Sequence, residues 1–274
     1  MALPSIKLPG GRINYQVSGS GEPLLMMRGY GSHLGWWDPE FISILEESFQ
    51  LILYDHRGTG HSVHTSGDYS ILTLAKDAAG LVEKLGFEKV NVFGLSLGGM
   101  VAQELAIAWP GRIKSLVLGA THCGGATLVP PSPEVMQIML ERAREGRREP
   151  IDETWLAIAF TPAFLLENPR AVKAYLERAA KLPTDPEIIS LQAQAAAVFD
   201  ACNRDPAITS PTWILHGQFD AIVPVGNAFV LQSHIPFSRI LILPGLGHDF
   251  TVQSPSYAAW LLTNIIQLDE IIQP

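Results

Sequence analysis

Short apolar runs alternate with longer segments of helical periodicity along most of the chain. The runs are continuously hydrophobic and cover residues 23–27, 49–54, 90–95, 113–118, 212–216 and 239–243. Strands that are covered on both faces in a parallel sheet have this pattern. Residues 12–17 instead alternate weakly and are followed by a Ser-Gly-Ser-Gly stretch, which favours an antiparallel strand.

The segments between these runs carry helix start and stop signals. Asp38 and Ser254 are each followed by proline, which is the typical pairing of an N-cap with the first helical residue. Residues 71–85 repeat apolar positions on one helical face and stop at Gly86, a natural C-terminal cap. A further helix is predicted over residues 96–109, because a Pro-Gly pair follows it.

One long stretch interrupts the alternation of strands and helices. Residues 124–207 contain no convincing strand, and Asn168 and Asp185, each followed by proline, mark two helix starts inside it. The pattern therefore predicts an α/β fold whose core comprises residues 1–123 and 208–274. Residues 124–207 are predicted to form an all-helical insertion.

Composition narrows the class of protein. The chain has 274 residues, of which 47% are hydrophobic and 17% charged, so it is too apolar for a disordered protein. Its net charge of −8 argues against nucleic-acid binding, which needs clustered cations. No apolar run approaches the roughly 18 residues of a membrane span, and the N-terminus does not resemble a signal peptide. We expect a cytoplasmic protein with no nucleic-acid or membrane partner.

Cysteine spacing bears on redox and metal chemistry. Cys123 and Cys202 lie far apart in the sequence and form no Cys-x-x-Cys pair. We expect neither a disulfide framework nor a zinc ribbon, and we interpret Cys123 as a small buried residue.

The strongest chemical motif lies where a predicted strand meets a predicted helix. Ser96 stands at the centre of Gly94-Leu95-Ser96-Leu97-Gly98, directly after the run at residues 90–95. A sharp turn there would expose the serine oxygen at a helix N-terminus, where free N–H groups favour negative charge. The flanking positions need glycine because the strand and helix backbones pass too close for a Cβ.

A serine hydroxyl needs a base, and the base needs an orienting group. Asp220 follows the run at residues 212–216, and His248 follows the run at residues 239–243. Their order after Ser96 is the one expected for a nucleophile elbow. We therefore predict a catalytic triad of Ser96, Asp220 and His248.

These motifs resemble the α/β-hydrolase superfamily over essentially the whole chain. The resemblance rests on residues 28–31, residues 55–62, the Ser96 elbow and the ends of the two predicted strands that precede Asp220 and His248. It implies that the helical insertion is the family's cap domain. It also implies an oxyanion hole made by the backbone N–H groups of Tyr30 and Leu97.

The chain departs from the family pattern at one position and leaves some roles open. Arg28 stands where the family usually has histidine, so it would either bind a substrate carboxylate or form a structural ion pair. We interpret residues 55–62 as a loop that braces the sheet, although their histidines raise the alternative of a metal site. His216 is interpreted as a satisfied residue at a sheet end.

Apolar side chains of the insertion predict a hydrophobic access route to Ser96. Of the two tryptophans after the oxyanion loop, Trp36 and Trp37, we assign Trp37 to the pocket wall. We further hypothesise that Phe160 and Phe164 face the pocket. The other bulky candidates in the insertion are Met136, Met139, Trp155, Tyr175 and Phe199.

The resemblance and the triad together favour a serine hydrolase that uses no metal or organic cofactor. We expect it to cleave small to medium, partly hydrophobic esters or lactones through an acyl-enzyme. The same triad in this superfamily also serves carbon–carbon hydrolases and perhydrolases, and some members bind ligands as receptors with little turnover. The sequence is compatible with a homodimer.

Overall fold

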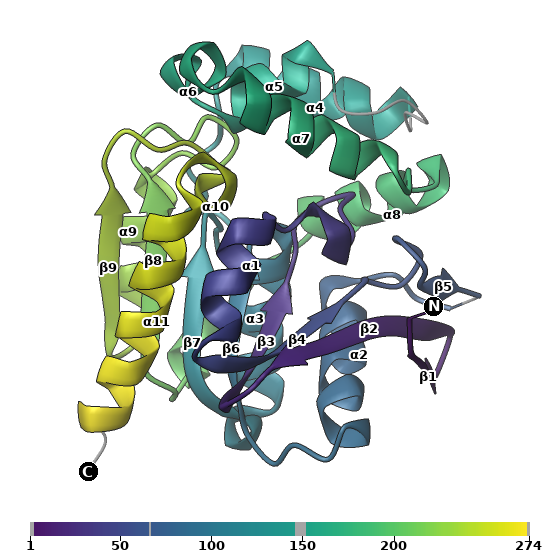
Figure 1. The fold of residues 1–274 in the computed structure, drawn as a ribbon, viewed down its shortest axis with the longest axis vertical. Helices are drawn as coiled ribbons and strands as arrows, with labels where there is room; N and C mark the ends of the chain where they lie inside the picture. Colours follow the sequence, from purple (N-terminus) through teal and green to yellow (C-terminus); the bar gives the residue numbers. More distant parts are fainter. Residues whose placement is uncertain (1–2, 66, 146–151, 273–274) are drawn as a thin grey trace.

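The computed structural model describes residues 3–65, 67–145 and 152–272, and its centre is a twisted sheet (Figure 1). The strand order is β1-β2-β4-β3-β6-β7-β8-β9, with β5 paired to β2. Strands β3, β4, β6, β7, β8 and β9 run parallel, while β1, β2 and β5 pair antiparallel. The bounds are β1 Ser5–Leu8, β2 Gly11–Gly19, β3 Glu22–Met27, β4 Phe49–Tyr54, β5 Val63–His64, β6 Val90–Leu95, β7 Ile113–Gly119, β8 Thr212–Gly217 and β9 Ser238–Leu243.

Helices cover both faces of the sheet and bury two separate apolar layers. Side chains of α2, α3 and α9 pack in one layer, and those of α1 and α11 pack in the other (Figure 1). This double coverage explains why the parallel strands are hydrophobic at nearly every position. The bounds are α1 Pro39–Glu46, α2 Ile71–Lys84, α3 Leu97–Ala108, α9 Gly226–His234, α10 Phe250–Gln253 and α11 Pro255–Ile272, with short 3-10 turns η1 Leu34–Trp36, η2 Pro110–Arg112 and η3 Asp205–Ala207.

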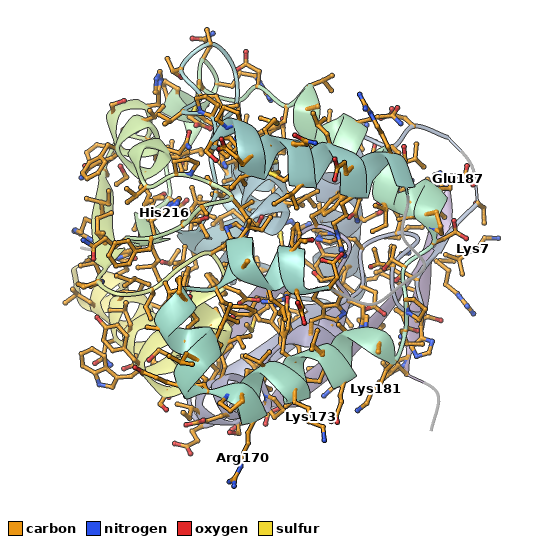
Figure 2. The ribbon with its side chains drawn as sticks, turned by 90° about the horizontal axis from the view of Figure 1, so that it is seen from above. Lys7, Arg170, Lys173, Lys181, Glu187 and His216 are labelled. Carbon is orange, nitrogen blue, oxygen red and sulfur yellow. A yellow bond between two sulfur atoms is a disulfide. The ribbon has the colours of Figure 1, made fainter. Side chains whose placement is uncertain are left out.

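Five helices of the described chain lie between β7 and β8, above the sheet in Figure 1. They are α4 Pro133–Glu145, α5 Glu153–Ala159, α6 Pro162–Glu167, α7 Pro169–Ala180 and α8 Pro186–Ala197. We call them the helical insertion. Figure 2, seen from above, shows Arg170, Lys173 and Lys181 on the outer side of the insertion. Tyr175 and Ala179, on α7, are buried underneath, so this helix is amphipathic.

The predicted pattern of strands and helices is confirmed. All six apolar runs are parallel strands, and their bounds agree with the structure to within one residue. Asp38 is the N-cap of α1, where its side chain accepts a hydrogen bond from the N–H of Glu40 at 3.0 Å. Strands β1 and β5 were not predicted, because each is short and only half-buried. No helix in the described chain is both long and apolar enough to cross a bilayer.

The expectation that the cysteines form no disulfide is wrong, although Cys123 is buried as expected. Cys123 and Cys202 form a disulfide, with 4.9 Å between their Cα atoms and a sequence separation of 79. Cys123 follows β7 and Cys202 precedes η3, so the fold brings the two ends of the insertion together. Sequence distance gave no sign of this proximity. Disulfides are rare in the reducing cytosol, and the expected cytoplasmic location stays a prediction.

Candidate active site

Ser96 occupies a strained turn between β6 and α3. Its backbone has φ 59° and ψ −120°, a region that residues other than glycine rarely adopt. A Cβ at Gly98 would overlap the carbonyl oxygen of Met27, and one at Gly94 would overlap the carbonyl oxygen of Gly98. The hydroxyl of Thr121 donates to the Ser96 carbonyl at 2.8 Å and holds the turn from β7. The local structure is therefore the sharp strand-to-helix turn that the motif predicts, while the role of Ser96 as a nucleophile stays a prediction.

Asp220 and His248 meet at the carboxyl ends of β8 and β9. The distance from His248 Nδ1 to Asp220 Oδ2 is 2.8 Å, and both residues are buried. The other carboxylate oxygen of Asp220 accepts the N–H groups of Ile222 at 3.0 Å and Val223 at 2.8 Å. These contacts fix the carboxylate, so His248 is oriented with Nδ1 toward it.

Electrostatics keep Asp220 ionised. Burial alone would raise the pKa of its carboxyl, but the charge of His248 and the hydrogen bonds from His216 and His248 outweigh burial and lower the pKa to about 2. An ionised Asp220 can only accept, so the Nδ1 of His248 donates and its Nε2 is left to take a proton. His216 Nε2 lies 2.7 Å from the carbonyl oxygen of Val223 and 3.3 Å from Asp220 Oδ2. Its Nδ1 is buried and has no hydrogen-bond partner among the described groups, so only one ring nitrogen is satisfied as expected.

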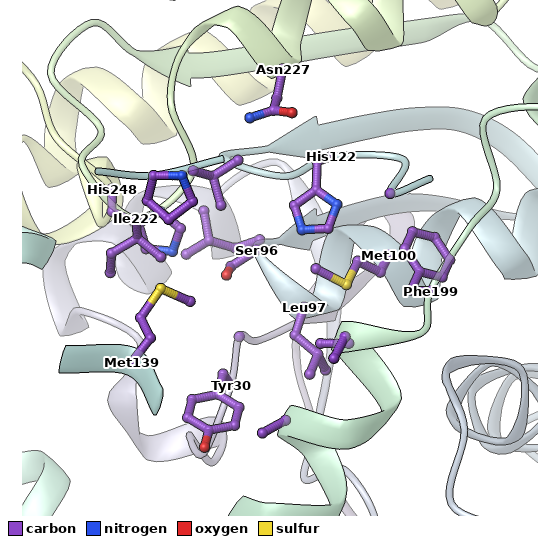
Figure 3. Close-up of a pocket in the computed structure, with 18 of the residues that line it drawn as sticks. Tyr30, Ser96, Leu97, Met100, His122, Met139, Phe199, Ile222, Asn227 and His248 are labelled. Carbon is purple, nitrogen blue, oxygen red and sulfur yellow. The ribbon is translucent and has the colours of Figure 1, made fainter. Parts of the chain in front are cut away.

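A cavity of about 530 Å³ lies between the sheet edge and the insertion, and Ser96 and His248 both line it. Figure 3 places Ser96 centrally, with His248 to one side, His122 to the other and Tyr30 below. The wall is mainly apolar, as predicted for the access route. Its large apolar residues include Met100, Leu128, Val129, Met136, Met139, Leu140, Trp155, Tyr175, Phe199 and Ile222.

Tyr30 and Leu97 border the same cavity beside Ser96. Leu97 is the first residue of α3, and Tyr30 lies in a tight turn in which the Gly29 carbonyl accepts the hydroxyl of Ser32 at 2.6 Å. Neither backbone N–H of Tyr30 or Leu97 donates a hydrogen bond to another described group. Both residues border the cavity beside Ser96, and their role as oxyanion donors stays a prediction.

Arg28 lines the cavity, but its charge is already paired. Its guanidinium binds the Asp249 carboxylate, with Nη2 at 2.5 Å from Oδ2, and lies 3.4 Å from the Thr251 hydroxyl. It also stacks 4.6 Å from the ring centre of Trp37. Of the two alternatives for Arg28, this arrangement is the structural ion pair.

Three residues assigned to the pocket wall lie elsewhere. Trp37, Phe160 and Phe164 are not among the described residues that line the cavity. Trp37 packs against Phe41 of α1, 5.7 Å between ring centres, and its neighbour Trp36 takes the position on the cavity wall. The turn η1 ends at Trp36, and Trp37 is its C-cap, so the two consecutive side chains join different apolar layers.

Phe160 and Phe164 form an aromatic layer behind the cavity wall. Their ring centres are 5.2 Å apart, and Phe160 packs edge-on against Tyr175 at 5.1 Å. Tyr175 stands between this layer and the cavity. Sequence spacing placed both phenylalanines on the insertion but could not show which apolar layer each joins.

His122 is a cavity residue that sequence reasoning missed. It follows the carboxyl end of β7, and Figure 3 shows its ring extending toward Ser96. Burial and the nearby charges of His216 and His248 lower its pKa to about 4, so the imidazole is neutral at pH 7. Its Nδ1 is buried and has no hydrogen-bond partner among the described groups. The signal that could have found it is the one used for Asp220, a polar residue just after a buried strand.

The loop at residues 55–62 braces the sheet edge, as interpreted from the sequence. Asp55 accepts the N–H groups of Leu34 at 2.7 Å and His61 at 2.9 Å. Arg57 binds both carboxylate oxygens of Asp77, at 2.6 and 2.7 Å. Within the described part of the chain, no group of three or more histidine, cysteine or acidic residues is placed to hold a metal ion.

Comparison with known proteins assigns the class. The model of the α/β hydrolase fold family matches residues 22–255, and the chain belongs to this family. Its relatives support a hydrolase.

Individual relatives resemble the chain over most of its length. A protein of Azorhizobium caulinodans, provisionally named carbamate hydrolase RutD, is 29% identical over 88% of this chain and 89% of its own. The poly(3-hydroxyalkanoate) depolymerase of Ectopseudomonas oleovorans is also 29% identical, over 89% of this chain and 84% of its own. A solved structure of a thermophilic esterase from Thermogutta terrifontis aligns with a TM-score of 0.82 at 27% identity, covering 97% of both chains.

Proposed function

We propose that the protein is a serine hydrolase that cleaves carboxylic esters, including lactones, through an acyl-enzyme. The observation that carries this proposal is the arrangement of Ser96, His248 and Asp220. A serine in a strained elbow shares one cavity with a histidine whose Nδ1 is bound to a buried, ionised carboxylate at 2.8 Å. The similarity to an esterase structure supports the ester class.

The first half-reaction forms the acyl-enzyme. Ser96 Oγ attacks the substrate carbonyl carbon while His248 takes the serine proton at Nε2. The backbone N–H groups of Tyr30 and Leu97 hold the oxyanion of the tetrahedral intermediate. His248 then gives its proton to the leaving alkoxide. In a lactone the leaving alkoxide stays attached to the acyl group.

The second half-reaction releases the acid. Water loses a proton to His248 and attacks the acyl carbon, and the returned proton regenerates Ser96. Asp220 holds the imidazole in one tautomer through both steps and stabilises its protonated form. No step needs a metal ion or an organic cofactor.

The cavity defines the substrate class. Its volume of about 530 Å³ and its methionine-rich and aromatic wall suit an ester of small to medium size with an apolar part. Because Arg28 is paired with Asp249, no described residue that lines the cavity offers an unpaired guanidinium to an anionic substrate.

Hydrolysis of a graded ester series tests the proposal. We would assay p-nitrophenyl esters from acetate to decanoate, a homoserine lactone and a six-membered lactone, with wild type, Ser96→Ala and the exposed-serine control Ser43→Ala. Ser96→Ala should lower kcat by about 10³-fold or more, because the nucleophile is lost while binding persists. Ser43→Ala should match wild type, and both variants should keep the wild-type Tm.

Two outcomes would contradict the proposal. Ester turnover that survives in Ser96→Ala would remove the serine from the mechanism. Folded wild-type protein that turns over no ester or lactone would favour carbon–carbon hydrolysis, perhydrolysis or ligand binding without turnover.

A further inference from the structure

Two side chains of the helical insertion hold the loop that carries Tyr30. Gln192, on α8, is fully buried, and its Oε1 accepts the N–H of Gly31 at 2.7 Å. Thr184, just before α8, donates its hydroxyl to the Gly31 carbonyl at 2.9 Å. Both backbone groups of Gly31 are therefore bound by the insertion, although Gly31 belongs to the sheet edge.

The amide of Gln192 is itself held in one orientation. Its Nε2 donates to the hydroxyl of Tyr69 at 3.1 Å, and that hydroxyl donates to the Arg57 carbonyl at 2.9 Å. The Gly31 N–H can only donate, so it requires the oxygen of Gln192 to face it. Arg57 is fixed in turn by its two bonds to Asp77. The Gln192 amide therefore links the insertion to the sheet edge through both of its ends. Its oxygen binds Gly31, and its nitrogen binds Tyr69, which in turn binds Arg57.

The turn geometry explains why Gly31 matters for the neighbouring residue. The turn runs from Gly29 to Ser32, and Gly31 has φ +66° at its third position, which glycine adopts without strain. Two peptide planes flank the Cα of Tyr30. The Gly29 carbonyl orients the first, which includes the Tyr30 N–H, and the Gly31 N–H belongs to the second.

Each plane has a different anchor. Ser32, within the turn, binds the Gly29 carbonyl at 2.6 Å, whereas Gln192 binds the Gly31 N–H. A Cβ on Gly31 would meet the side chain of Ile189 at 2.7 Å, so α8 also packs directly on the turn. Ser32 directly follows Gly31, and it closes the turn on the Gly29 carbonyl through its hydroxyl at 2.6 Å and its N–H at 3.4 Å. Loss of the Gln192 contact would free the second plane, and movement of Gly31 and Ser32 would then shift the Gly29 carbonyl and, with it, the Tyr30 N–H of the same plane.

We propose that Gln192, supported by Thr184, is a positioning residue for the oxyanion hole. The insertion then covers the cavity and also aims the Tyr30 N–H at the substrate oxygen. The inference rests on the proposed function, because it takes the Tyr30 N–H as an oxyanion donor. Gln192 Oε1 and the Thr184 hydroxyl act through their hydrogen bonds to Gly31, and neither group needs to touch the substrate.

Isosteric variants test the role kinetically. Gln192→Leu removes both polar contacts, and Thr184→Val removes one hydroxyl with little change of shape. Deleting an oxyanion donor outright costs roughly 10²- to 10³-fold in kcat. A misdirected donor should cost less, so we expect kcat to fall about 10- to 100-fold in Gln192→Leu and about 3- to 10-fold in Thr184→Val, with KM within about twofold of wild type.

Conservative variants and a control accompany them. Thr184→Ser keeps the hydroxyl and should recover most of kcat. Gln192→Glu keeps an acceptor for the Gly31 N–H and should retain more activity than Gln192→Leu. Gln194→Leu, on the exposed side of α8, should behave as wild type.

A tetrahedral mimic separates positioning from general damage to the fold. With a trifluoromethyl ketone that carries the preferred acyl chain, Ser96 Oγ bonds to the carbonyl carbon. Its proton passes to His248, and the carbonyl oxygen becomes an oxyanion. The inhibition constant should rise in Gln192→Leu by the same factor as kcat/KM falls, while the affinity for the carboxylic acid product stays unchanged.

The outcomes are distinct. Wild-type kcat and trifluoromethyl ketone affinity in folded Gln192→Leu and Thr184→Val would overturn this inference, as would a rise in KM alone. If Gln192→Leu does not fold, the Thr184→Val and Thr184→Ser pair decides the question. Full turnover in Ser96→Ala within the same assay would instead overturn the proposed function.

Discussion

The two walls of the cavity differ in chemistry and in construction. The sheet edge supplies polar groups on strand ends, with Ser96 after β6, His122 after β7 and His248 after β9. The insertion supplies mainly apolar side chains on helices, such as Met139 and Trp155. Strand ends are fixed by their neighbours, so they suit groups that need accurate placement. Helical side chains can vary without disturbing them.

Two polar residues of the insertion break this division. Gln192 and Thr184 reach the sheet edge and bind Gly31 there. The difference between the walls therefore lies in which side chains face the cavity, because polar side chains of the insertion also bind the sheet edge at Gly31. Variants on either side of this boundary test how far the two walls differ.

The largest expected effect is a loss of stability when the aromatic layer behind the apolar cavity wall is disrupted. Phe160→Ala should lower the free energy of unfolding by about 3–5 kcal/mol, because Phe160 is only 3% exposed and packs on Phe164 and Tyr175. Met139→Ala, on the cavity surface, should instead shift the preferred ester chain length. Urea unfolding and the ester series measure the two effects. A shift in chain-length preference in Phe160→Ala with unchanged stability would restore its assignment to the pocket.

The next effect concerns the junction of the two regions. Replacing both Cys123 and Cys202 by alanine should lower the free energy of unfolding by about 2–4 kcal/mol, because the disulfide closes a long loop. The measurement is Tm with and without dithiothreitol. In reductant, the Tm of the wild type should fall toward that of the double variant. The Tm of the double variant should be the same with and without reductant. Equal Tm values in all four samples would contradict a stabilising disulfide.

The smallest effect is a pH dependence of the free energy of unfolding, caused by Asp205 in η3, close to Cys202 in the sequence. Asp205 is fully buried, and neither carboxylate oxygen has a hydrogen-bond partner among the described groups. Burial raises its pKa to about 7, against the opposing charge of Arg204. The folded state then binds a proton that the unfolded state has released, so stability should decline as pH rises from about 4 to about 7.

Asp205→Asn removes the group that titrates. The variant should lose this decline and exceed wild type by about 1–3 kcal/mol at pH 8, with the gain shrinking toward pH 4. Denaturant unfolding at pH 4, 6 and 8 measures the difference. A constant difference at all three pH values would show that Asp205 does not titrate in this range.

Sequence patterns predicted local features well and long-range contacts poorly. The parallel strands follow from continuous apolar runs, and Ser96, Asp220 and His248 follow from their places after strands. The pairing of Cys123 with Cys202 depends on how two distant segments approach in the fold, which no spacing rule contains. The catalytic roles, a homodimer and the cellular location stay predictions.

The pocket assignments show the same limit at single residues. Trp36 and Trp37 have identical side chains, and the local backbone where η1 ends at Trp36 decides which one borders the cavity. Gln192 sits among small and polar residues of α8 and carries no motif. Its partner Gly31 lies 161 residues away in sequence, so its contact could only be found in three dimensions.

The disulfide makes the insertion part of a covalent ring. Cys123 and Cys202 close a loop of backbone that contains all five helices of the insertion. A protease that cuts once between them would leave two polypeptides still joined through sulfur. The nicked protein would migrate as one species on a non-reducing gel and as two after reduction. Cleavage within the insertion therefore need not detach the wall that faces Ser96.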